Sequence, residues 1–261
     1  MIAGMTFLEQ GDQNNLAAAR YFAEREDGAV VREDAGMLLV ASTYPYVRSL
    51  FFSTARRFDR GVPTEKSIAA VRSFSAEHGQ QLNLWASVDG DRDLIAAAEA
   101  AGMTRGAELE DMATAVAPAL PTTASGVELA EVGSESEVDA FADVHRAARI
   151  EAGQESDSVQ HYASRTVLLD PRVHAFVAYF DGTPAACAMA FRHEDSAGLF
   201  WVATKTEARN RGLGALVSSA ATRAAFQSGA RSVTLTATAL GAPVYRRLGF
   251  EQFSTRARYG D

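Results

Sequence analysis

The sequence predicts a mixed α/β (α+β) protein of two domains. Its 261 residues exceed the usual single-domain size of about 100–150 residues. A hydrophobic fraction of 47% and a charged fraction of 22% are typical of globular proteins, and short apolar strands alternate with helical segments in the second half. The stretch 117–126, rich in proline and small residues, indicates a linker between domains 1–120 and 121–261.

The first half shows a helix–strand–helix–strand order. We expect helices over 68–79 and 91–103, a strand over 82–88 between them, and another strand after the second helix. The C-terminal region repeats this order, so an internal duplication is one interpretation, and coincidence between similar units is the other. The segment 55–67, which precedes the first helix, has one glycine, a proline and no Gly-x-Gly.

The second half begins its strands with a hairpin. Segments 173–180 and 184–191 flank Asp181-Gly182, a dipeptide that favours tight hairpin turns. The other predicted elements are a helix over 137–150 capped by Ser134 or Ser136, a strand over 198–204, a helix from about 212 to 228 ending at Gly229, a strand over 232–238 and a short helix between Pro243 and Gly249.

Two glycines and two arginines occupy the turn between a strand and a helix. The first N–H groups of a helix lack intrahelical partners and attract anions, phosphate above all. Gly212 and Gly214 remove side-chain bulk there, and Arg209 and Arg211 add charged donors. A P-loop needs a lysine after the last glycine, and a dinucleotide fingerprint needs a glycine where Val217 stands, so neither motif fits. A tight turn with surface arginines remains the alternative to an anion site.

A second segment adds to this turn. VATKTEARNRGLG (202–214) and TATALGAPVYRRLGF (236–250) together resemble the GNAT superfamily of GCN5-related N-acetyltransferases, from about residue 127 to the end. The resemblance implies the GNAT fold, a mixed and mostly antiparallel central sheet flanked by helices. It further implies a tandem arrangement of two GNAT-like domains, in which domain 1–120 is degenerate and domain 121–261 is catalytic.

The resemblance also implies a site. The turn would hold the pyrophosphate of acetyl-CoA, the end of the preceding strand would pair with the pantetheine arm, and a backbone N–H there would stabilise the oxyanion. Tyr245 occupies the place of the tyrosine that protonates the leaving thiolate, although it could instead be a packing residue. The implied cofactor contacts are Val202, Ala203, Thr204, Arg209, Asn210, Arg211, Gly212, Leu213 and Gly214.

The chain departs from the family pattern at the general base. Many members have a glutamate on the strand before the turn, and residues 198–204 contain no carboxylate. Glu207 lies past that strand, where a surface role is expected. The polar segment 151–164 carries Glu151, Glu155 and Asp157, which could hold a substrate ammonium or be solvated.

Composition limits the remaining choices. A formal charge of −8 argues against nucleic-acid binding, and Cys187, the only cysteine, is expected in the core and excludes an internal disulfide. No His, Cys or Asp spacing indicates a metal site. The first residues lack a signal pattern and no segment is apolar enough for a membrane span, so we expect a cytoplasmic protein without membrane partners.

These inferences define the expected activity. The chain is expected to be an acetyl-CoA-dependent N-acetyltransferase that transfers an acetyl group to a primary amine of a small molecule or peptide by direct attack on the thioester. A homodimer is compatible with this expectation. The alternative is a non-catalytic CoA-binding, CoA-sensing or interaction module that has kept the phosphate turn.

Overall fold

The computed structural model of the chain describes residues 5–43, 50–154 and 156–260, which fall into two compact units. Unit 1 takes in the C-terminal segment as well as the first part of the chain, so the units interleave along the sequence. The predicted boundary near residue 120 and the roles given to its two sides stay predictions. Unit 1 contains Met1–Met112, Thr236–Leu240 and Gln252–Asp261, and unit 2 contains Ala113–Leu235 and Gly241–Glu251.

The predicted hairpin is present in unit 2. Strands β7 and β8 meet at Asp181 and Gly182, whose φ values of 47° and 74° are those of a primed hairpin turn. The unit contains β6 (Val127–Glu131), α4 (Glu135–Glu151), α5 (Val159–Tyr162), α6 (Arg165–Leu168), β7 (Val173–Phe180), β8 (Thr183–His193), β9 (Ser196–Thr204), the 3₁₀ helix η1 (Thr206–Ala208), α7 (Leu213–Gln227), β10 (Ser232–Ala237, its last residues in unit 1) and α8 (Ala242–Arg247).

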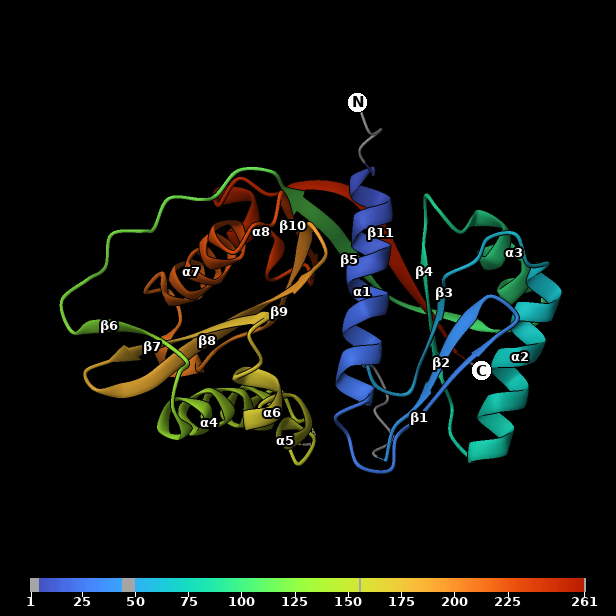
Figure 1. Cartoon of the computed structure of the whole chain (residues 1–261), viewed down its shortest axis with the longest axis horizontal. Coiled ribbons are helices and arrows are strands. Elements are labelled where there is room, and N and C mark those ends of the chain that lie inside the picture. The colour runs from blue at the N-terminus through green and yellow to red at the C-terminus, as the bar shows by residue number, and fades with distance from the viewer. Residues whose placement is uncertain (1–4, 44–49, 155, 261) are drawn as a thin grey trace. The chain divides into compact units, whose positions relative to one another are not determined.

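Helices cover both faces of the unit 2 sheet. Its strands lie in the order β6-β7-β8-β9-β10, antiparallel except for the β9–β10 pair. Figure 1 shows α7 on one face and α4 on the other, and both helices contact β7, β8 and β9. Every residue from 185 to 191 of β8 is buried for this reason, so the strand is apolar throughout instead of alternating.

The helix ends of unit 2 follow the predicted signals. Ser134 is the N-cap of α4, and the carboxylate of Glu137 accepts hydrogen bonds from the amides of Gly133 and Ser134, each 2.8 Å long. Gly229 follows α7 and Gly249 follows α8, with φ values of 106° and 85° that favour glycine. The predicted helices and strands of residues 137–249 are therefore confirmed to within a few residues.

The strands of unit 1 lie in the order β1-β2-β3-β4-β11-β5. The β3–β4 pair is parallel, and β11 lies antiparallel to β4. The C-terminal strand thus completes the sheet of the first unit. The elements are α1 (Phe7–Ala23), β1 (Val30–Asp34), β2 (Met37–Ala41), β3 (Thr54–Arg57), α2 (Thr64–His78), β4 (Asn83–Ser87), α3 (Arg92–Ala100), β5 (Thr104–Thr114, its last residues in unit 2) and β11 (Glu251–Gly260).

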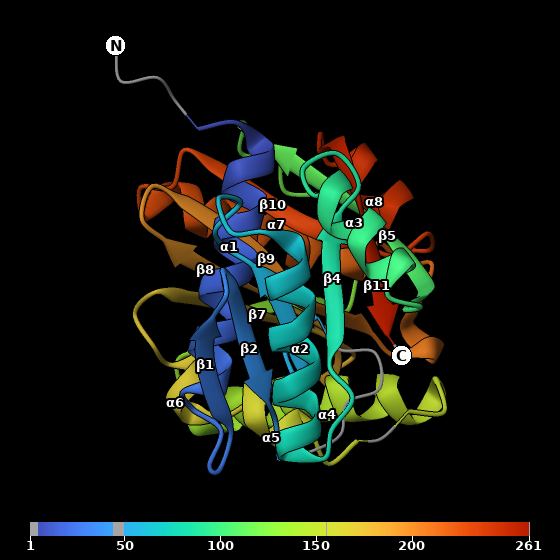
Figure 2. The ribbon, with the colours of Figure 1, turned by 90° about the vertical axis from the view of Figure 1, so that its right-hand side faces the viewer.

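The core of unit 1 lies between its sheet and helices α2 and α3. Figure 2 shows these helices in front of β2 and β4. Phe74 of α2 and Leu94 of α3 are fully buried there, together with Leu39 and Leu84 of the strands. Helix α1 contacts β1 and β2. Within the described residues of both units, no helix has both the length and the apolar run that a membrane span requires.

Both units repeat one order of elements. A helix is followed by an antiparallel pair, a third strand, a helix, a strand parallel to the third, a short helix and a last strand. In unit 1 this series is α1-β1-β2-β3-α2-β4-α3-β5, and in unit 2 it is α4-β7-β8-β9-α7-β10-α8, followed along the chain by β11. The repeated order favours internal duplication over coincidence.

Helix α1 and strand β3 were absent from the sequence prediction. Thr6 and Glu9 form a capping box at the start of α1, with Thr6 N to Glu9 Oε2 at 2.8 Å, and this Thr-x-x-Glu signal is readable in the sequence. The buried positions of the helix include Asp12, however, and those of β3 include Arg56 and Arg57. Charged residues in the interior hide the apolar periodicity on which such predictions depend.

A buried charge network explains these polar positions. Arg256 of β11, 2% exposed, places Nη2 2.7 Å from Asp12 Oδ1 and 2.8 Å from Asp111 Oδ2. Burial works against ionisation of Asp12, but Arg256 and Arg60 outweigh it and lower the pKa of that carboxyl. The network therefore joins α1, β5 and β11 through ionised groups.

Replacing Arg256 by Met should destabilise unit 1 strongly. Two buried carboxylates would lose their shared cation, and breaking a buried ion pair from one side costs about 3–5 kcal/mol in the free energy of unfolding. Urea denaturation measures this loss. Arg92→Met is the control, because the Arg92 side chain is 81% exposed, and it should change the same quantity by less than about 0.5 kcal/mol. Equal effects of the two variants would refute the role of Arg256.

Candidate active site

The predicted arginine turn connects β9 to α7 in unit 2. Asn210 and Gly212 have φ values of 61° and 77°, the left-handed region that favours asparagine and glycine. Gly212 is the N-cap of α7, and among the described residues no side chain caps this helix start. Its first N–H groups are therefore available to donate hydrogen bonds to an anion.

Gly214 is required by a close approach. A Cβ added at Gly214 would lie 3.1 Å from Oγ1 of Thr204, the last residue of β9. This distance is shorter than ordinary carbon–oxygen contact, so a larger residue requires a shift of a few tenths of an ångström by the Thr204 hydroxyl or by the helix start. The second glycine of the motif therefore permits the close approach of β9 and α7.

The arginine side chains of the turn lie on its surface. Arg209 Nε is 3.4 Å from the carbonyl oxygen of Thr204, and the Arg211 guanidinium stacks on the Phe180 ring at 4.3 Å from the ring centroid. Both residues are exposed. They surround the helix start with positive charge while leaving its amides uncovered.

Glu151 has a local partner. Its carboxylate accepts hydrogen bonds from the N–H and the hydroxyl of Thr206, and Oε2 lies 3.8 Å from Arg209 Nη2. The Thr206 hydroxyl is the main cause of the lowered pKa of Glu151. Glu151 therefore anchors the turn to the end of α4, a role that the sequence did not indicate. Of the other acidic candidates, Asp157 is exposed and Glu155 lies outside the described residues.

Strand β9 separates from β10 near its middle. The parallel register runs from Ser196–Ser232 to Gly198–Thr234, and no further β9–β10 pair follows among the described residues of this unit. Phe200 folds back over Gly198, where a Cβ would lie 2.1 Å from the ring. The second half of β9, with Val202, Ala203 and Thr204, thus offers backbone groups on the side facing away from β8.

A bulge interrupts the other side of β9. The register with β8 shifts between Cys187 and Met189, and Trp201 has a φ of 51°. Left-handed backbone is unusual for a bulky residue and needs support from its surroundings. The Tyr162 ring supplies part of that support, because it stacks on the Trp201 ring with centroids 3.7 Å apart and planes 6° apart.

His145 of α4 lies under this bulge. Its Nε2 is 2.5 Å from the carbonyl oxygen of Trp201, and its Nδ1 is 3.4 Å from the hydroxyl of Tyr162. Burial lowers the pKa of His145 to about 4, so the ring is neutral near pH 7. Cys187, fully buried as predicted, has its thiol 4.0 Å from the same carbonyl, and burial raises its pKa.

No motif in the sequence singles out His145 or Tyr162 as functional residues. One signal was readable: His145 falls on the buried face of an amphipathic helix, four residues after Phe141. A histidine on such a face needs hydrogen-bond partners, and only the fold shows that one of them is a strand bulge.

Tyr245 lies on α8, which contacts α7 in the same unit. Its ring packs edge-on against Phe250, with centroids 5.9 Å apart. Burial raises the pKa of the phenol to about 12, and the nearby side chain of Ser218 on α7 lowers it by less. The phenol is therefore protonated at neutral pH, and it is a weaker acid than a tyrosine with the ordinary pKa near 10.

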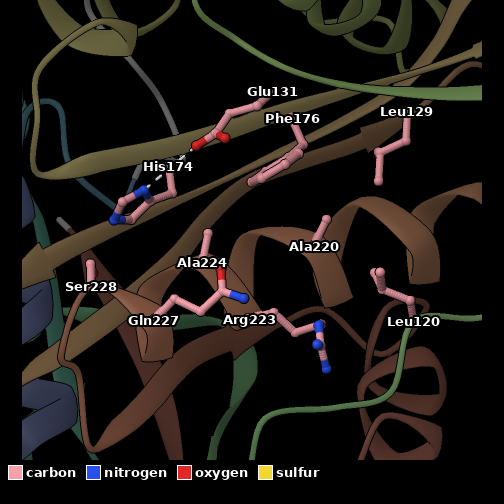
Figure 3. Close-up of a pocket in the computed structure, with 10 residues that line it drawn as sticks. All are labelled: Leu120, Leu129, Glu131, His174, Phe176, Ala220, Arg223, Ala224, Gln227 and Ser228. Carbon is pink, nitrogen blue, oxygen red and sulfur yellow. Dashed lines mark ion pairs between the residues drawn. The ribbon is translucent and has the colours of Figure 1, made fainter.

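A cavity of unit 2 lies elsewhere, with a volume of about 540 Å³. Figure 3 shows the residues that line it, most of them from α7 and strands β6 and β7. His174 lines the cavity with Nδ1 3.8 Å from Glu131 Oε1. None of the predicted site residues lines it. A hollow of about 20 Å³ does touch Arg211, Gly212 and Leu213.

The corresponding turn of unit 1 is filled by its own side chains. It connects β3 to α2, and its Gly61 amide donates to Asp59 Oδ1 at 2.8 Å. Arg60 is paired with Asp12 at 2.6 Å, and the N-cap of α2 is Pro63, which has no N–H. The start of α2 also lacks a side-chain cap, so the two turns differ in their side chains, and an anion here would meet the Asp59 carboxylate.

The comparisons with known proteins agree with this geometry. Residues 138–250 match the model of the Acetyltransferase (GNAT) family. The match supports acyl transfer in general, without defining the substrate. No protein of curated function matches the sequence.

Solved structures extend the likeness beyond this domain. A GCN5-related N-acetyltransferase from Kribbella flavida is 22% identical with a TM-score of 0.77, over 99% of this chain and 96% of that one. Another from Sphaerobacter thermophilus is 13% identical with a TM-score of 0.64, over 98% and 93%. A tandem GNAT protein from the clavulanic acid biosynthesis pathway is 15% identical with a TM-score of 0.63, over 98% and 94%.

At these identities the likeness establishes the fold. The predicted fold class and the resemblance to GNAT proteins are confirmed. The individual site residues and the domain roles stay predictions.

Proposed function

We propose that the chain is an acetyl-CoA-dependent N-acetyltransferase whose site lies in domain 121–261. The observation that carries this proposal is the uncapped start of α7. It follows β9, a strand whose pairing with β10 ends before the turn. It lies inside the residues that match the GNAT acetyltransferase family. A diphosphate and an extended arm are the ligand parts that fit such a pair of features.

The turn would hold the diphosphate of acetyl-CoA. Its bare glycine positions let phosphate oxygens reach the amides of the α7 start, and its arginines add charge-assisted hydrogen bonds. The arm would lie along the free side of β9 and pair with its backbone. The proposed contacts are Val202, Ala203, Thr204, Arg209, Asn210, Arg211, Gly212, Leu213 and Gly214.

Tyr245 would supply the proton for the leaving thiolate. In the reaction the amine nitrogen bonds to the acyl carbon, the carbon–sulfur bond breaks, and the thiolate takes the phenolic proton. A pKa of about 12 keeps that proton on Tyr245 until the step. An alkyl thiol has a pKa near 8.5 in water, but a buried site also raises the proton affinity of a thiolate, which narrows the difference.

The amine must lose a proton as well. No residue of β9 is a carboxylate, and the buried His145 uses both ring nitrogens within the protein. We therefore propose that the amine arrives as the neutral free base or loses its ammonium proton to water, and that the proton released from nitrogen after the attack passes through water to restore the Tyr245 phenol. The acceptor is a primary amine of a small molecule or peptide, and the acidic chain favours a cationic one.

A non-catalytic CoA-binding or sensing module is the second candidate. The absence of a carboxylate from β9 and the weak acidity of Tyr245 favour it. Release of free thiol from acetyl-CoA, measured with a panel of small amines and peptides, distinguishes the two functions. Amine-dependent release supports the enzyme. Binding of CoA without release under any acceptor supports the module.

The Tyr245→Phe variant should lose turnover and keep cofactor affinity. Removal of a general acid typically lowers kcat by about 10²–10⁴-fold, while the ring and its packing on Phe250 are retained. Steady-state kinetics and calorimetric titration with CoA measure the two quantities. Tyr179→Phe, on β7 of the same unit, is the control and should leave both unchanged. Lost CoA affinity with unchanged kcat would show that Tyr245 is structural.

The Gly214→Val variant should weaken cofactor binding first. Its side chain would collide with Thr204 and move the amides of the α7 start. We expect the Kd for CoA to rise at least about tenfold, which is about 1.4 kcal/mol. Gly133→Val provides the control, because the nearest atom to a Cβ at this exposed position is 3.9 Å away. An unchanged Kd would place the diphosphate elsewhere.

Domain 1–120 is proposed to be a degenerate copy that binds no CoA. In the turn of unit 1 the Asp59 carboxylate accepts from the Gly61 amide, Arg60 is paired with Asp12, and Pro63 at the N-cap of α2 has no N–H. Titration calorimetry should therefore give a stoichiometry of about one CoA per chain, as expected for a single anion site. If a second equivalent of CoA binds, and still binds in the Gly214→Val variant, the assignment of unit 1 as degenerate is contradicted.

A further inference from the structure

A hydrogen bond from His145 of α4 holds the Trp201–Val202 peptide. His145 Nε2 lies 2.5 Å from the Trp201 carbonyl oxygen. A carbonyl oxygen only accepts hydrogen bonds, so the ring proton is on Nε2 and the imidazole donates. The unprotonated Nδ1 is then the acceptor for the Tyr162 hydroxyl. Tyr162 and His145 thus form a chain of donors that ends on the backbone of β9.

This hydrogen bond fixes the direction of an amide. The described peptide bonds are trans, and in a trans peptide the C=O and the N–H point in opposite directions. Because the Trp201 carbonyl points to His145 on α4, the N–H of Val202 points away from α4. Val202 also falls in the bulge, outside the β8–β9 register. Its amide is therefore aimed by His145 and is not part of that ladder.

We propose that His145 is a positioning residue, whose hydrogen bond to the Trp201 carbonyl aims the Val202 N–H at the acyl carbonyl oxygen of the bound thioester. The proposal rests on the proposed function. The Val202 amide would donate to this oxygen as negative charge develops on it, and such donors act only when held in place beforehand. His145 itself touches neither the acyl group nor the amine.

The environment of His145 suits this role. The ring is sandwiched between Phe141, with centroids 5.4 Å apart, and the bulge, with Trp201 at 6.0 Å. Burial keeps it neutral, and the Tyr162 bond selects one tautomer. A neutral imidazole with a fixed proton is a single donor of constant direction. The Tyr162–Trp201 stack holds the left-handed residue in the same orientation.

The first experiment compares His145→Phe and His145→Gln with the wild type. Phenylalanine keeps a ring under the bulge but has no donor, and glutamine restores an N–H that can reach a carbonyl. In His145→Phe we expect kcat to fall about 100-fold while KM for acetyl-CoA changes by less than about threefold. His145→Gln should recover most of kcat. Arg146→Gln, on the exposed face of the same helix, is the matched control and should match the wild type.

Other outcomes overturn the proposal. If His145→Phe keeps wild-type kcat, the hydrogen bond positions nothing. If both variants lose kcat and thermal stability in parallel, with no recovery in glutamine, His145 is a structural core residue only. If His145→Phe does not fold, the His145→Gln variant decides the question. Full activity of His145→Gln supports the donor role, and a fall of about 100-fold in its kcat contradicts it.

A binding measurement separates this proposal from the proposed function. The Val202 amide should make wild-type protein bind acetyl-CoA more tightly than CoA, and His145→Phe should remove that preference while its affinity for CoA stays the same. Titration calorimetry with acetyl-CoA and with CoA tests this difference in affinity even when no amine is acetylated. Failure to acetylate any amine would reject only the enzymatic function. A wild-type protein without the preference, or a variant that retains it, would overturn the positioning role.

Discussion

The site depends on one constraint, which is that β9 must stop pairing with β10 before it reaches α7. A strand paired along both edges presents no free backbone groups to a ligand. Here the β10 ladder ends at Gly198, and a bulge at Trp201 interrupts the β8 ladder, which resumes at Ala203 and Thr204. The strain of the left-handed tryptophan is supported from α4 by hydrogen bonding and ring stacking. The proposed roles of the turn, the helix start and Tyr245 all require the unpaired backbone groups that β9 presents in this way.

The two units show how one order of elements yields different chemistry. In unit 2 the turn after the third strand has free amides and exposed arginines, whereas in unit 1 Asp59 caps an amide and Arg60 is already paired with Asp12. Unit 1 places charge in its interior instead, around Arg256. Buried ion pairs add little net stability over apolar packing, but they penalise any arrangement that leaves one member unpaired. The charges of unit 1 therefore specify its fold, and those of the unit 2 turn face solvent.

The accuracy of the sequence predictions varied with the range of the interactions concerned. Asp181-Gly182, Gly229 and Pro243 act within a few residues, and the elements that they bound were predicted to within a few residues. Helix α1 was missed because Asp12 lies on its buried face, and its partner Arg256 is 244 residues away along the chain. The raised pKa of Tyr245 was not predicted, because burial by α7 and Phe250 has no local signature in the sequence.

By itself the sequence determined the class of fold and the location of the arginine turn between β9 and α7, because glycine, proline and turn dipeptides restrict the backbone locally. Tertiary structure decided the rest. It brought His145 under Trp201, assigned Glu151 to the turn, and joined the C-terminal strand to the sheet of unit 1. These contacts join residues far apart in the chain, and their energies come from burial and hydrogen-bond geometry that exist only once the sheet and helices have packed.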